Sequence, residues 1–377
     1  MTGHDIPETE SNRRRFLASA AAVGAVGLAG CTGDDTDDSD GDGQSSIGQI
    51  GSGREGRGLP GGTPMSEMPD LSGELTVYSG RNEFLVGPLV DYIDEQYPDL
   101  DLTVRYNSST DHVNAILNEG DGSPADVFYS VNAGSLGALA DEGRTQAVPD
   151  DVAELVREEF RTDQWVGTSG RARTVPYDAE EYDASDVPSD IMAFPEEFDG
   201  DLAWAPSYGS CQAFVTAMRI IEGEEATLEW LESVVDSGIT PYNNEFRVCE
   251  EIAEGTADAG FTNHYYIQRV LDGDSEASIA TAFTEGDAGA VFNVAGAALV
   301  DTATDTELAG NFVRHLLSAE AQDYFARSTF EYPLIPDVEP IGDLPTIDEL
   351  DVPEIDLAEL SDLEATVDLM REAGVDI

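Results

Sequence analysis

The sequence contains no lysine: its 18 basic residues are all arginine, set against 77 aspartate and glutamate residues, and the formal net charge is -59 at pH 7. A chain of this charge repels a phosphate backbone, so we exclude nucleic acid as a partner. The acidic residues are spread through every segment instead of forming one cluster. This distribution is typical of a halophilic protein, whose self-repulsion is screened by concentrated salt.

Catalytic motifs are also missing. Only four histidines are present, and no Ser-His-Asp order, Walker loop, HExxH or CxxC pattern occurs. We therefore do not expect an enzyme. The 377 residues, 41% of them hydrophobic, are enough to bury sizeable cores.

The N-terminal run of small apolar residues is too short and too weakly hydrophobic to span a bilayer. It lies within NRRRFLASAAAVGAVGLAGC and follows three arginines. We interpret residues 1–31 as a removable export signal, with an uncleaved anchor helix as the alternative. Residues 13–17 resemble a twin-arginine signal and residues 28–31 a lipobox. This would make Cys31 the lipid attachment point and hold the protein at the extracellular face of the cell membrane.

Residues 32–72 are rich in Asp, Gly and Ser and almost empty of large apolar residues. Such a composition does not bury a core, so we expect an acidic, flexible tether.

Cysteine is scarce as well. Of three cysteines, Cys211 and Cys249 remain after Cys31. Outside the cytoplasm they are able to form one disulfide, and two buried thiols are the alternative.

The remaining residues alternate between strand and helix patterns. Strand-like runs at 75–78, 102–106 and 125–129 enclose helical patterns near 85–93 and 111–119. The alternation restarts after about Arg171, with a strand at 202–205 and helices at 211–221 and 227–235. This order predicts an α/β fold with two lobes, and such lobes usually bind a ligand in the cleft between them.

Two adjacent tyrosines, Tyr265 and Tyr266, follow a Thr-Asn-His run. In a plain strand they would face opposite ways, but where a strand gives way to a helix they can share a target. A phenolate is a hard anionic donor suited to Fe³⁺, which offsets the cost of removing the phenol proton. We therefore regard the pair as candidate ferric ligands; ordinary core and surface neighbours are the alternative.

Several segments carry residues suited to an anion. In WAPSYGSCQ a strand and small residues precede a helix, so free amides there would meet an anion, and Tyr208 could be a third phenolate. Arg81 follows the first strand and has planar donors for an anion. An ordinary capped helix or a solvated arginine is the alternative in each case. The candidate anion-binding residues are Arg81, Ser207, Gly209, Ser210, Asn244 and Asn263.

Five segments in order resemble the periplasmic ferric-ion-binding proteins of iron ABC importers, which belong to the extracellular solute-binding class. They are LTVYSGRNE, GSPADVFYSVNAGSLGALADEG, TSGRARTVPYD, NHYY and STFEYPL. The resemblance covers about Glu74 to Gly374. It implies a two-lobed Venus-flytrap fold of type II, joined by two crossing strands. Residues 73–170 and 288–338 would form the N-terminal lobe, and residues 171–287 and 339–377 the C-terminal lobe.

The resemblance also implies a function. Tyr265 and Tyr266, joined by Tyr208, would bind Fe³⁺ as cargo, with carbonate or phosphate at the helix start that contains Gly209 and Ser210. The implied partners are the permease and ATPase subunits of an ABC importer, and we expect a monomer. Asn82 and Val131 occupy positions where many members have histidine and glutamate ligands, so neither usual extra ligand is present.

Two rival interpretations remain. A binding protein for a small organic or phosphorylated solute would use the tyrosines for stacking or hydrogen bonds. An exported iron enzyme would need a positioned acid or base beside the metal, and the sequence shows none near the tyrosines.

Overall fold

The computed structural model describes residues 47–54, 57–361 and 363–377, which belong to one compact unit. The predicted export signal at 1–31, with Cys31, lies outside the described residues, as does the part of the predicted tether at 32–46. Within the described residues, no helix has both the length and the apolar character needed to cross a membrane.

The strands form one mixed sheet in the order β2-β1-β3-β11-β5-β8-β6-β7, with β4 beside β11 and β9 and β10 beside β5. Their bounds are β1 Gly73–Ser79, β2 Leu100–Tyr106, β3 Val127–Ser130, β4 Thr145–Gln146, β5 Val166–Asp178, β6 Leu202–Trp204, β7 Thr240–Pro241, β8 Ala259–Gly260, β9 Thr262–Asn263, β10 Ile279–Ala282 and β11 Phe292–Val300.

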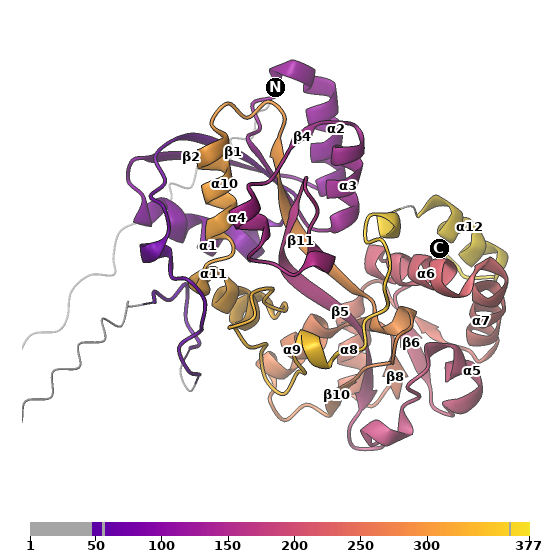
Figure 1. Ribbon diagram of the computed structural model, residues 1–377. Helices are drawn as coiled ribbons and strands as arrows, with labels where there is room; N and C mark the ends of the chain where they lie inside the picture. The colour runs from indigo at the N-terminus through magenta and orange to yellow at the C-terminus, as the bar shows by residue number, and fades with distance from the viewer. Residues whose placement is uncertain (1–46, 55–56, 362) are drawn as a thin grey trace, which may run out of the picture. The chain divides into compact units, whose positions relative to one another are not determined.

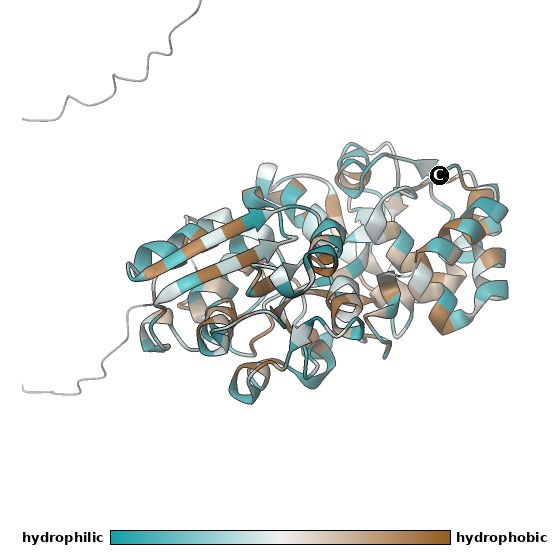
Figure 2. Ribbon diagram, turned by 90° about the horizontal axis from the view of Figure 1, so that it is seen from above, coloured by the Kyte–Doolittle hydropathy of each residue, from teal (hydrophilic) through white to brown (hydrophobic). Residues whose placement is uncertain are grey.

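The α-helices cover this sheet. They are α1 Glu83–Gln96, α2 Ser109–Glu119, α3 Ala133–Asp141, α4 Asp150–Ala153, α5 Phe194–Glu197, α6 Gly209–Glu222, α7 Glu224–Asp236, α8 Glu245–Ala253, α9 His264–Gly273, α10 Thr306–His315, α11 Ala319–Tyr324 and α12 Glu364–Glu372. Figure 2 shows hydrophilic and hydrophobic stretches alternating along their ribbons, as expected for helices that bury one face.

Local sequence explains the start of the fold. Strand β1 pairs in parallel with both β2 and β3, and α1 and α2 make the connections. Helix α1 begins after Asn82, whose side chain accepts a hydrogen bond from the amide of Phe84. The buried face of α1 includes Val86, Leu89 and Ile93, at the three- to four-residue spacing that the sequence pattern predicts.

Strands β5 and β11 connect two lobes. We call the part built on β1 to β4 the first lobe and the part built on β6 to β10 the second lobe. The first half of β5 pairs with β11, and its second half pairs with β9 and β10. Figure 1 shows both strands extending between the lobes, and because they are antiparallel, β5 runs towards the second lobe and β11 towards the first. The boundary predicted between residues 170 and 171 falls inside β5, and the residue limits of the lobes stay a prediction.

Two apolar cores support these parts. The larger cluster contains buried residues of both lobes, from Leu75 in β1 to Trp230 in α7. A smaller cluster in the second lobe contains Val248, Ile252, Tyr266 and Ile267. Tyr266 is therefore part of a packed core, which fixes the position of its ring.

Residues 47–54 and 57–72 lie within the stretch expected to form a tether, but they pack against the first lobe. Ile50 and Met65 are buried. Arg54 Nη2 donates to Asp323 Oδ2 of α11 at 2.7 Å, and the Gly61 amide donates to the Asp337 carbonyl oxygen at 2.9 Å. The tether predicted over residues 32–72 therefore stays a prediction only for residues 32–46.

The cysteines and the surface answer two further questions from the sequence. Cys211 and Cys249 are buried free thiols, so the structure has the two buried thiols that were the alternative and not the disulfide.

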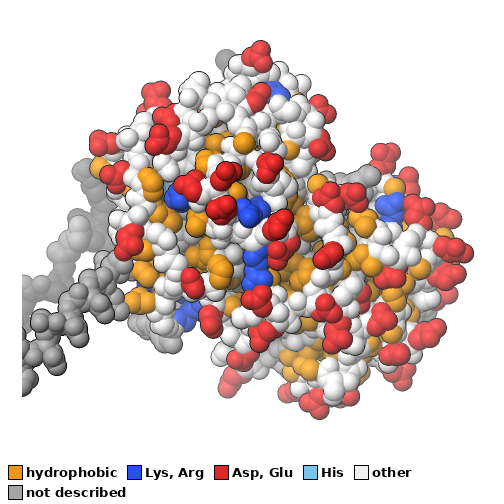
Figure 3. All heavy atoms as spheres, in the orientation of Figure 1, with side chains coloured by type: hydrophobic (Ala, Val, Ile, Leu, Met, Phe, Trp, Pro, Cys, Tyr) orange, Lys and Arg blue, Asp and Glu red, His pale blue; other side chains and the backbone are white. Residues whose placement is uncertain are grey.

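Acidic side chains are scattered over the whole face shown in Figure 3, and basic side chains are few on it. The acidic excess is thus a property of that surface at large, and the halophilic interpretation stays a prediction.

Candidate functional site

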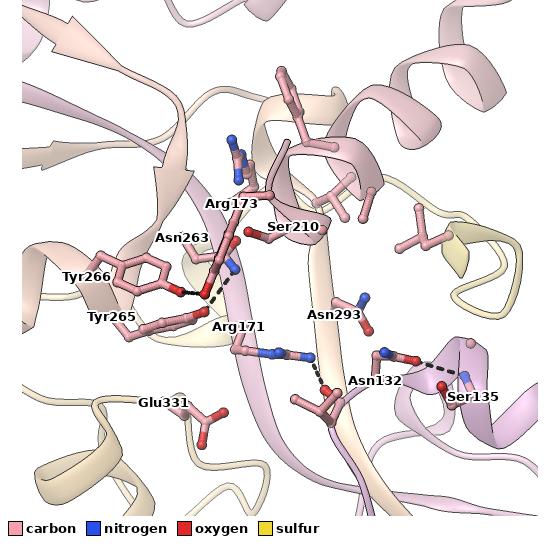
Figure 4. Close-up of a pocket in the computed structure, with 18 of the residues that line it drawn as sticks. Asn132, Ser135, Arg171, Arg173, Ser210, Asn263, Tyr265, Tyr266, Asn293 and Glu331 are labelled. Carbon is pink, nitrogen blue, oxygen red and sulfur yellow. Dashed lines mark hydrogen bonds between the residues drawn. The ribbon is translucent and has the colours of Figure 1, made fainter. Parts of the chain in front are cut away.

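A cavity of about 490 Å³ lies where the two lobes meet at β5 and β11. Its wall combines polar residues of the first lobe, the connecting strands and the second lobe (Figure 4). The residues that matter for the chemistry are Arg81, Thr110, Asn132, Ser135, Arg171, Arg173, Tyr208, Gly209, Ser210, Asn263, Tyr265, Tyr266, Arg269, Asn293 and Glu331.

The tyrosine pair stands at a junction between strand and helix. Strand β9 ends at Asn263 and α9 begins at His264, so Tyr265 and Tyr266 belong to the first turn of a helix. Successive helical side chains are about 100° apart, instead of the half-turn found in a strand. Figure 4 shows the hydroxyl groups of Tyr265 and Tyr266 directed to the same side. The change from strand to helix therefore allows both rings to share one target.

A third phenol completes the group. Tyr208 precedes α6, and its hydroxyl oxygen lies 2.8 Å from that of Tyr266. The rings of Tyr265 and Tyr266 have centroids 4.3 Å apart, and Asn263 Nδ2 donates to the Tyr265 hydroxyl at 3.5 Å. The structure thus brings together the three tyrosines that the sequence singled out.

Burial keeps the two adjacent phenols protonated. Only 5% of Tyr266 is exposed. Its pKa is raised, first by desolvation and then by Tyr265 and the nearby Glu245 carboxylate. Burial also raises the pKa of Tyr265, although the Arg171 guanidinium opposes the shift. Both groups therefore carry a proton unless a strong positive charge enters the cavity.

Two arginines of β5 add positive charge. Arg171 donates to the carbonyl oxygen of Val131 in the first lobe. Arg173 is 3% exposed and forms a 2.5 Å ion pair with Glu245 of α8. The Nε atoms of Arg171 and Arg173 are buried and have no hydrogen-bond partner, and the same is true of the Ser210 hydroxyl. Unpartnered buried donors are costly, so these atoms indicate a missing acceptor.

Arg81 lines the cavity, but its guanidinium is largely occupied. Its Nη1 donates to the Ser169 hydroxyl at 2.9 Å and its Nη2 to Glu331 Oε2 at 2.6 Å. Burial tends to raise the pKa of Glu331, yet Arg81 and Arg171 together hold that pKa below its usual range. Arg81 therefore anchors a carboxylate of the protein itself.

This geometry agrees with the proteins that the chain resembles in sequence and fold. The family model described as bacterial extracellular solute-binding protein matches residues 122–349, which is more than half of the chain. The chain belongs to this family. It is thus a solute-binding protein, and the family is one of binding proteins, in agreement with the expectation that the chain is not an enzyme.

A curated relative of this solute-binding protein is the Fe(3+)-binding periplasmic protein of Serratia marcescens. The two chains are 27% identical over 310 residues, which cover 80% of this chain and 90% of the relative. The similarity extends beyond the segment that the family model matches. It agrees with the resemblance noted in the sequence.

Two solved structures share the fold. Iron-bound HitA from Pseudomonas aeruginosa has a TM-score of 0.70 at 24% identity, covering 81% of this chain and 100% of the other. The Trichodesmium protein IdiA (FutA), in complex with iron and citrate ligands, has the same TM-score, identity and coverage. The predicted two-lobed α/β fold of type II is therefore confirmed.

Not every predicted site residue of the solute-binding protein reaches the cavity. Gly209, Ser210 and Asn263 line it, but Ser207 and Asn244 are not part of the wall. Ser207 is exposed. Asn244 caps α8, where its side chain accepts a hydrogen bond from the amide of Arg247 at 2.8 Å. Asn244 thus has the ordinary capping role that the sequence left open.

His264 connects the tyrosine helix to the strands between the lobes. Its Nδ1 accepts from the Ala172 amide at 3.2 Å, and its Nε2 donates to the Phe330 carbonyl oxygen at 2.7 Å. Burial lowers the pKa of His264 to about 4, so the ring is neutral at neutral pH. His264 therefore positions the first turn of α9.

Four cavity residues were not predicted from the sequence: Arg171, Arg173, Arg269 and Glu331. A signal for the first two was available, because arginines two residues apart in TSGRARTV point to the same face of a strand. Arg269 follows Tyr265 by four residues, and its guanidinium carbon lies 5.1 Å from the ring centroid of Tyr265. Glu331 had no local signal, since its partner Arg81 is 250 residues away.

Proposed function

We propose that this protein is the extracellular Fe³⁺ receptor of an ABC-type iron importer and that Tyr208, Tyr265 and Tyr266 bind the ion as phenolates. The observation that carries the proposal is the 2.8 Å distance between the hydroxyl oxygens of Tyr208 and Tyr266. The two hydroxyls share a hydrogen bond of ordinary length. It holds their oxygens close enough to bind one octahedral ion, whose neighbouring ligand atoms lie about 2.8 Å apart. The ferric-binding name of the curated relative supports the same ion.

The chemistry of the tyrosine group suits a trivalent ion. Phenolate is a hard donor, and Fe³⁺ is a hard acceptor with enough charge to displace the phenol protons. Within the described residues, no cluster of three or more His, Cys, Asp or Glu side chains is placed to hold a metal. A divalent ion that prefers imidazole or several carboxylates therefore finds few suitable ligands around Tyr266.

Anion oxygens complete the coordination in this proposal. We expect carbonate or phosphate near Gly209 and Ser210, which line the cavity in the first turn of α6, where the backbone amides have no partner within the helix. Arg171 and Arg173 are better placed than Arg81 to hold the anion, because their Nε atoms have no partner. Lobe closure around the ion then gives the form that the permease and ATPase subunits recognise.

The remaining parts of the proposal concern the cell surface. Export by a twin-arginine signal and attachment through lipid on Cys31 would place this receptor, as a monomer, outside the membrane. The acidic surface would keep it soluble in concentrated salt.

The test of the ligands is spectroscopic. Purified protein given ferric citrate should turn orange to red through a charge transfer from phenolate to iron. Tyr266→Phe should lose most of the colour and affinity, whereas Tyr182→Phe, a control outside the cavity, should keep both. A colourless iron complex of the unaltered protein would refute tyrosine ligation.

The arginines favour one alternative function. Four arginines line the cavity, which suits a small phosphorylated solute that the tyrosines stack on or bind by hydrogen bonds. Such a site should tolerate Tyr266→Phe with modest weakening. The same variant therefore separates the two functions.

A further inference from the structure

Besides β5 and β11, a later part of the chain also connects the two lobes. Val338, after α11, is 5% exposed in the first lobe, and α12 packs against α6 and α7 of the second lobe. We call the connecting residues 339–361 the strap. It is irregular chain with short turns at Ile347–Glu349 and Glu359–Ser361, and Figure 1 shows its second half, in yellow, leading to α12.

The middle of the strap is bonded to both lobes. Arg157 of the first lobe donates from Nη1 to Asp348 Oδ1 at 2.5 Å. The Gly286 amide, after β10 in the second lobe, donates to the Asp351 carbonyl oxygen at 2.9 Å. The Asp348 side chain is 73% exposed, and concentrated salt screens such an ion pair, so the pair contributes little to holding the lobes together.

The end of the strap makes an apolar contact with both lobes. The turn Glu359–Ser361 lies against α3 of the first lobe and α6 of the second. Leu360, in this turn, is 3% exposed and lines the cavity. Because α3 and α6 belong to opposite lobes, opening of the cleft would separate the turn from one of them and expose Leu360 to water. Exposure of a buried leucine is unfavourable, and salt does not screen this contact as it screens the ion pair.

Helix α3 has a glycine where the strap approaches it. A Cβ atom at Gly137 would lie 2.7 Å from the Cβ atom of Ala358, which is closer than such atoms pack. Glycine in the interior of a helix is less favourable than alanine. The close approach of the strap therefore explains the glycine at this position of α3, and it shows a contact with the first lobe independently of Leu360.

We propose that the strap holds the cleft closed and slows the exchange of the bound cargo. The strap continues into α12 of the second lobe, so separation of the lobes breaks the contact between Ala358 and Gly137 and exposes Leu360. This inference goes beyond the proposed function, because the strap acts on the lobes whatever ion or solute the cavity holds. It requires only that the lobes open and close.

The distance between the lobes tests the strap directly. In the full chain with Cys31→Ser, fluorophores are attached at Glu95→Cys in α1 and at Glu232→Cys in α7, both exposed positions, while Cys211 and Cys249 are buried. Energy transfer in concentrated KCl reports the mean separation of the two labels with and without iron. Transfer of iron to a chelator reports the rate of exchange.

The first variant removes the apolar contact. Leu360→Ala should lengthen the mean distance between the labels in the iron-free protein and release iron about tenfold faster. The phenolate band should keep its position, since no tyrosine is changed. Leu59→Ala, at a leucine of the first lobe that is 57% exposed, should match the unaltered protein in both measurements.

The second variant displaces the strap from the side of α3 and alters no residue of the cavity wall. The methyl group of Gly137→Ala would overlap Ala358, whereas alanine itself favours the helix. A longer label distance and a release of iron about tenfold faster would therefore come from the displaced strap. Gly273→Ala in α9, where a Cβ atom finds open space, is the matched control and should change neither.

The outcomes separate the strap from the ferric function. An unchanged label distance in Gly137→Ala, or a release of iron within twofold of the unaltered protein, overturns the proposal, including the case in which Leu360→Ala does not fold. If the unaltered protein binds no iron but Gly137→Ala still lengthens the label distance, the ferric function is wrong and the role of the strap is supported.

Discussion

Arg81 Nη2 and Glu331 Oε2 lie 2.6 Å apart, and both side chains are buried, at 1% and 7% exposed. The pair joins the loop after β1 to the segment after α11, beside the cavity. Removing one partner leaves an uncompensated buried charge, so we expect Glu331→Leu to lower the free energy of unfolding by about 3 kcal/mol. Denaturant unfolding in concentrated KCl measures this cost.

The matched control for this pair is the double variant Arg81→Met with Glu331→Leu. It removes both charges and should recover most of the lost stability. A double variant less stable than the single one would show that the pair matters for something other than charge compensation. The exposed pair of Arg371 and Asp368 should contribute little when broken.

Iron loading should release protons. The phenols of Tyr265 and Tyr266 have raised pKa values, so they enter the complex by losing protons to solvent. Each phenol that ionises makes the affinity fall by about tenfold for every unit of decreasing pH. Tyr266→Phe should release one proton fewer than the unaltered protein, as measured by titration in weakly buffered salt. Equal proton release by the two would argue against ionisation of Tyr266.

His315 should make the fold acid-sensitive. It is buried between Tyr97 and Asn311, and burial lowers its pKa from 6.5 to about 4. Between these two pKa values the His315 ring is protonated in the unfolded chain and neutral in the folded chain. The free energy of unfolding therefore decreases as the pH falls from about 6.5 towards 4. Between pH 7 and pH 5, His315 should lower the free energy of unfolding by about 2 kcal/mol.

The measurement for His315 compares two pH profiles of unfolding. His315→Gln lacks the titrating group, so its stability should fall less steeply between pH 7 and pH 5 than that of the unaltered protein. The many carboxylates and His264 titrate in both proteins, and their effects cancel in the difference. Parallel profiles of the two proteins would mean that His315 does not cause the loss of stability at acid pH.

Arg54 should stabilise the first lobe. Asp323 is buried, and its Oδ2 accepts hydrogen bonds from Arg54 and Arg327. Arg54→Gln leaves Asp323 with one cationic partner, so we expect a loss of about 1 to 2 kcal/mol. Calorimetric melting in concentrated salt checks this, with Arg57→Gln as the control, because the Arg57 side chain donates to the carbonyl oxygens of Glu339 and Pro340 at 3.0 and 3.3 Å. An unchanged melting temperature for Arg54→Gln would show that the ion pair of Arg54 with Asp323 does not stabilise the first lobe.

Local patterns explain how much of the fold and site could be predicted. The runs 75–78 and 102–106 became β1 and β2, and the helix expected at 211–221 became α6, because alternation and capping act over a few residues. The tyrosine pair was found for the same reason, since its strand-to-helix junction is local. Strand β5 was harder, because nearly all of its residues are buried and alternation is absent.

The charged partners of the site residues could not be predicted from local patterns, because they come from distant parts of the sequence. Arg81 was expected to hold an anion of the ligand, but Glu331 reaches it through the return of the chain after α11. Asn244 was expected near the anion, although its own helix start already uses its side chain. Asn263, by contrast, lies beside Tyr265 in sequence, and its place in the cavity wall followed from that proximity.

The N-terminal segment that the structure describes packs against one lobe, the first. Residues 47–54 and 57–72 form hydrogen bonds or ion pairs with Asp323 and Asp337, in α11 and the chain after it, and with Tyr97 at the end of α1. Whatever holds the preceding residues therefore holds the first lobe. In the proposed receptor, anchoring of the preceding residues would thus fix the first lobe, and opening of the cleft would move the second lobe with its three tyrosines.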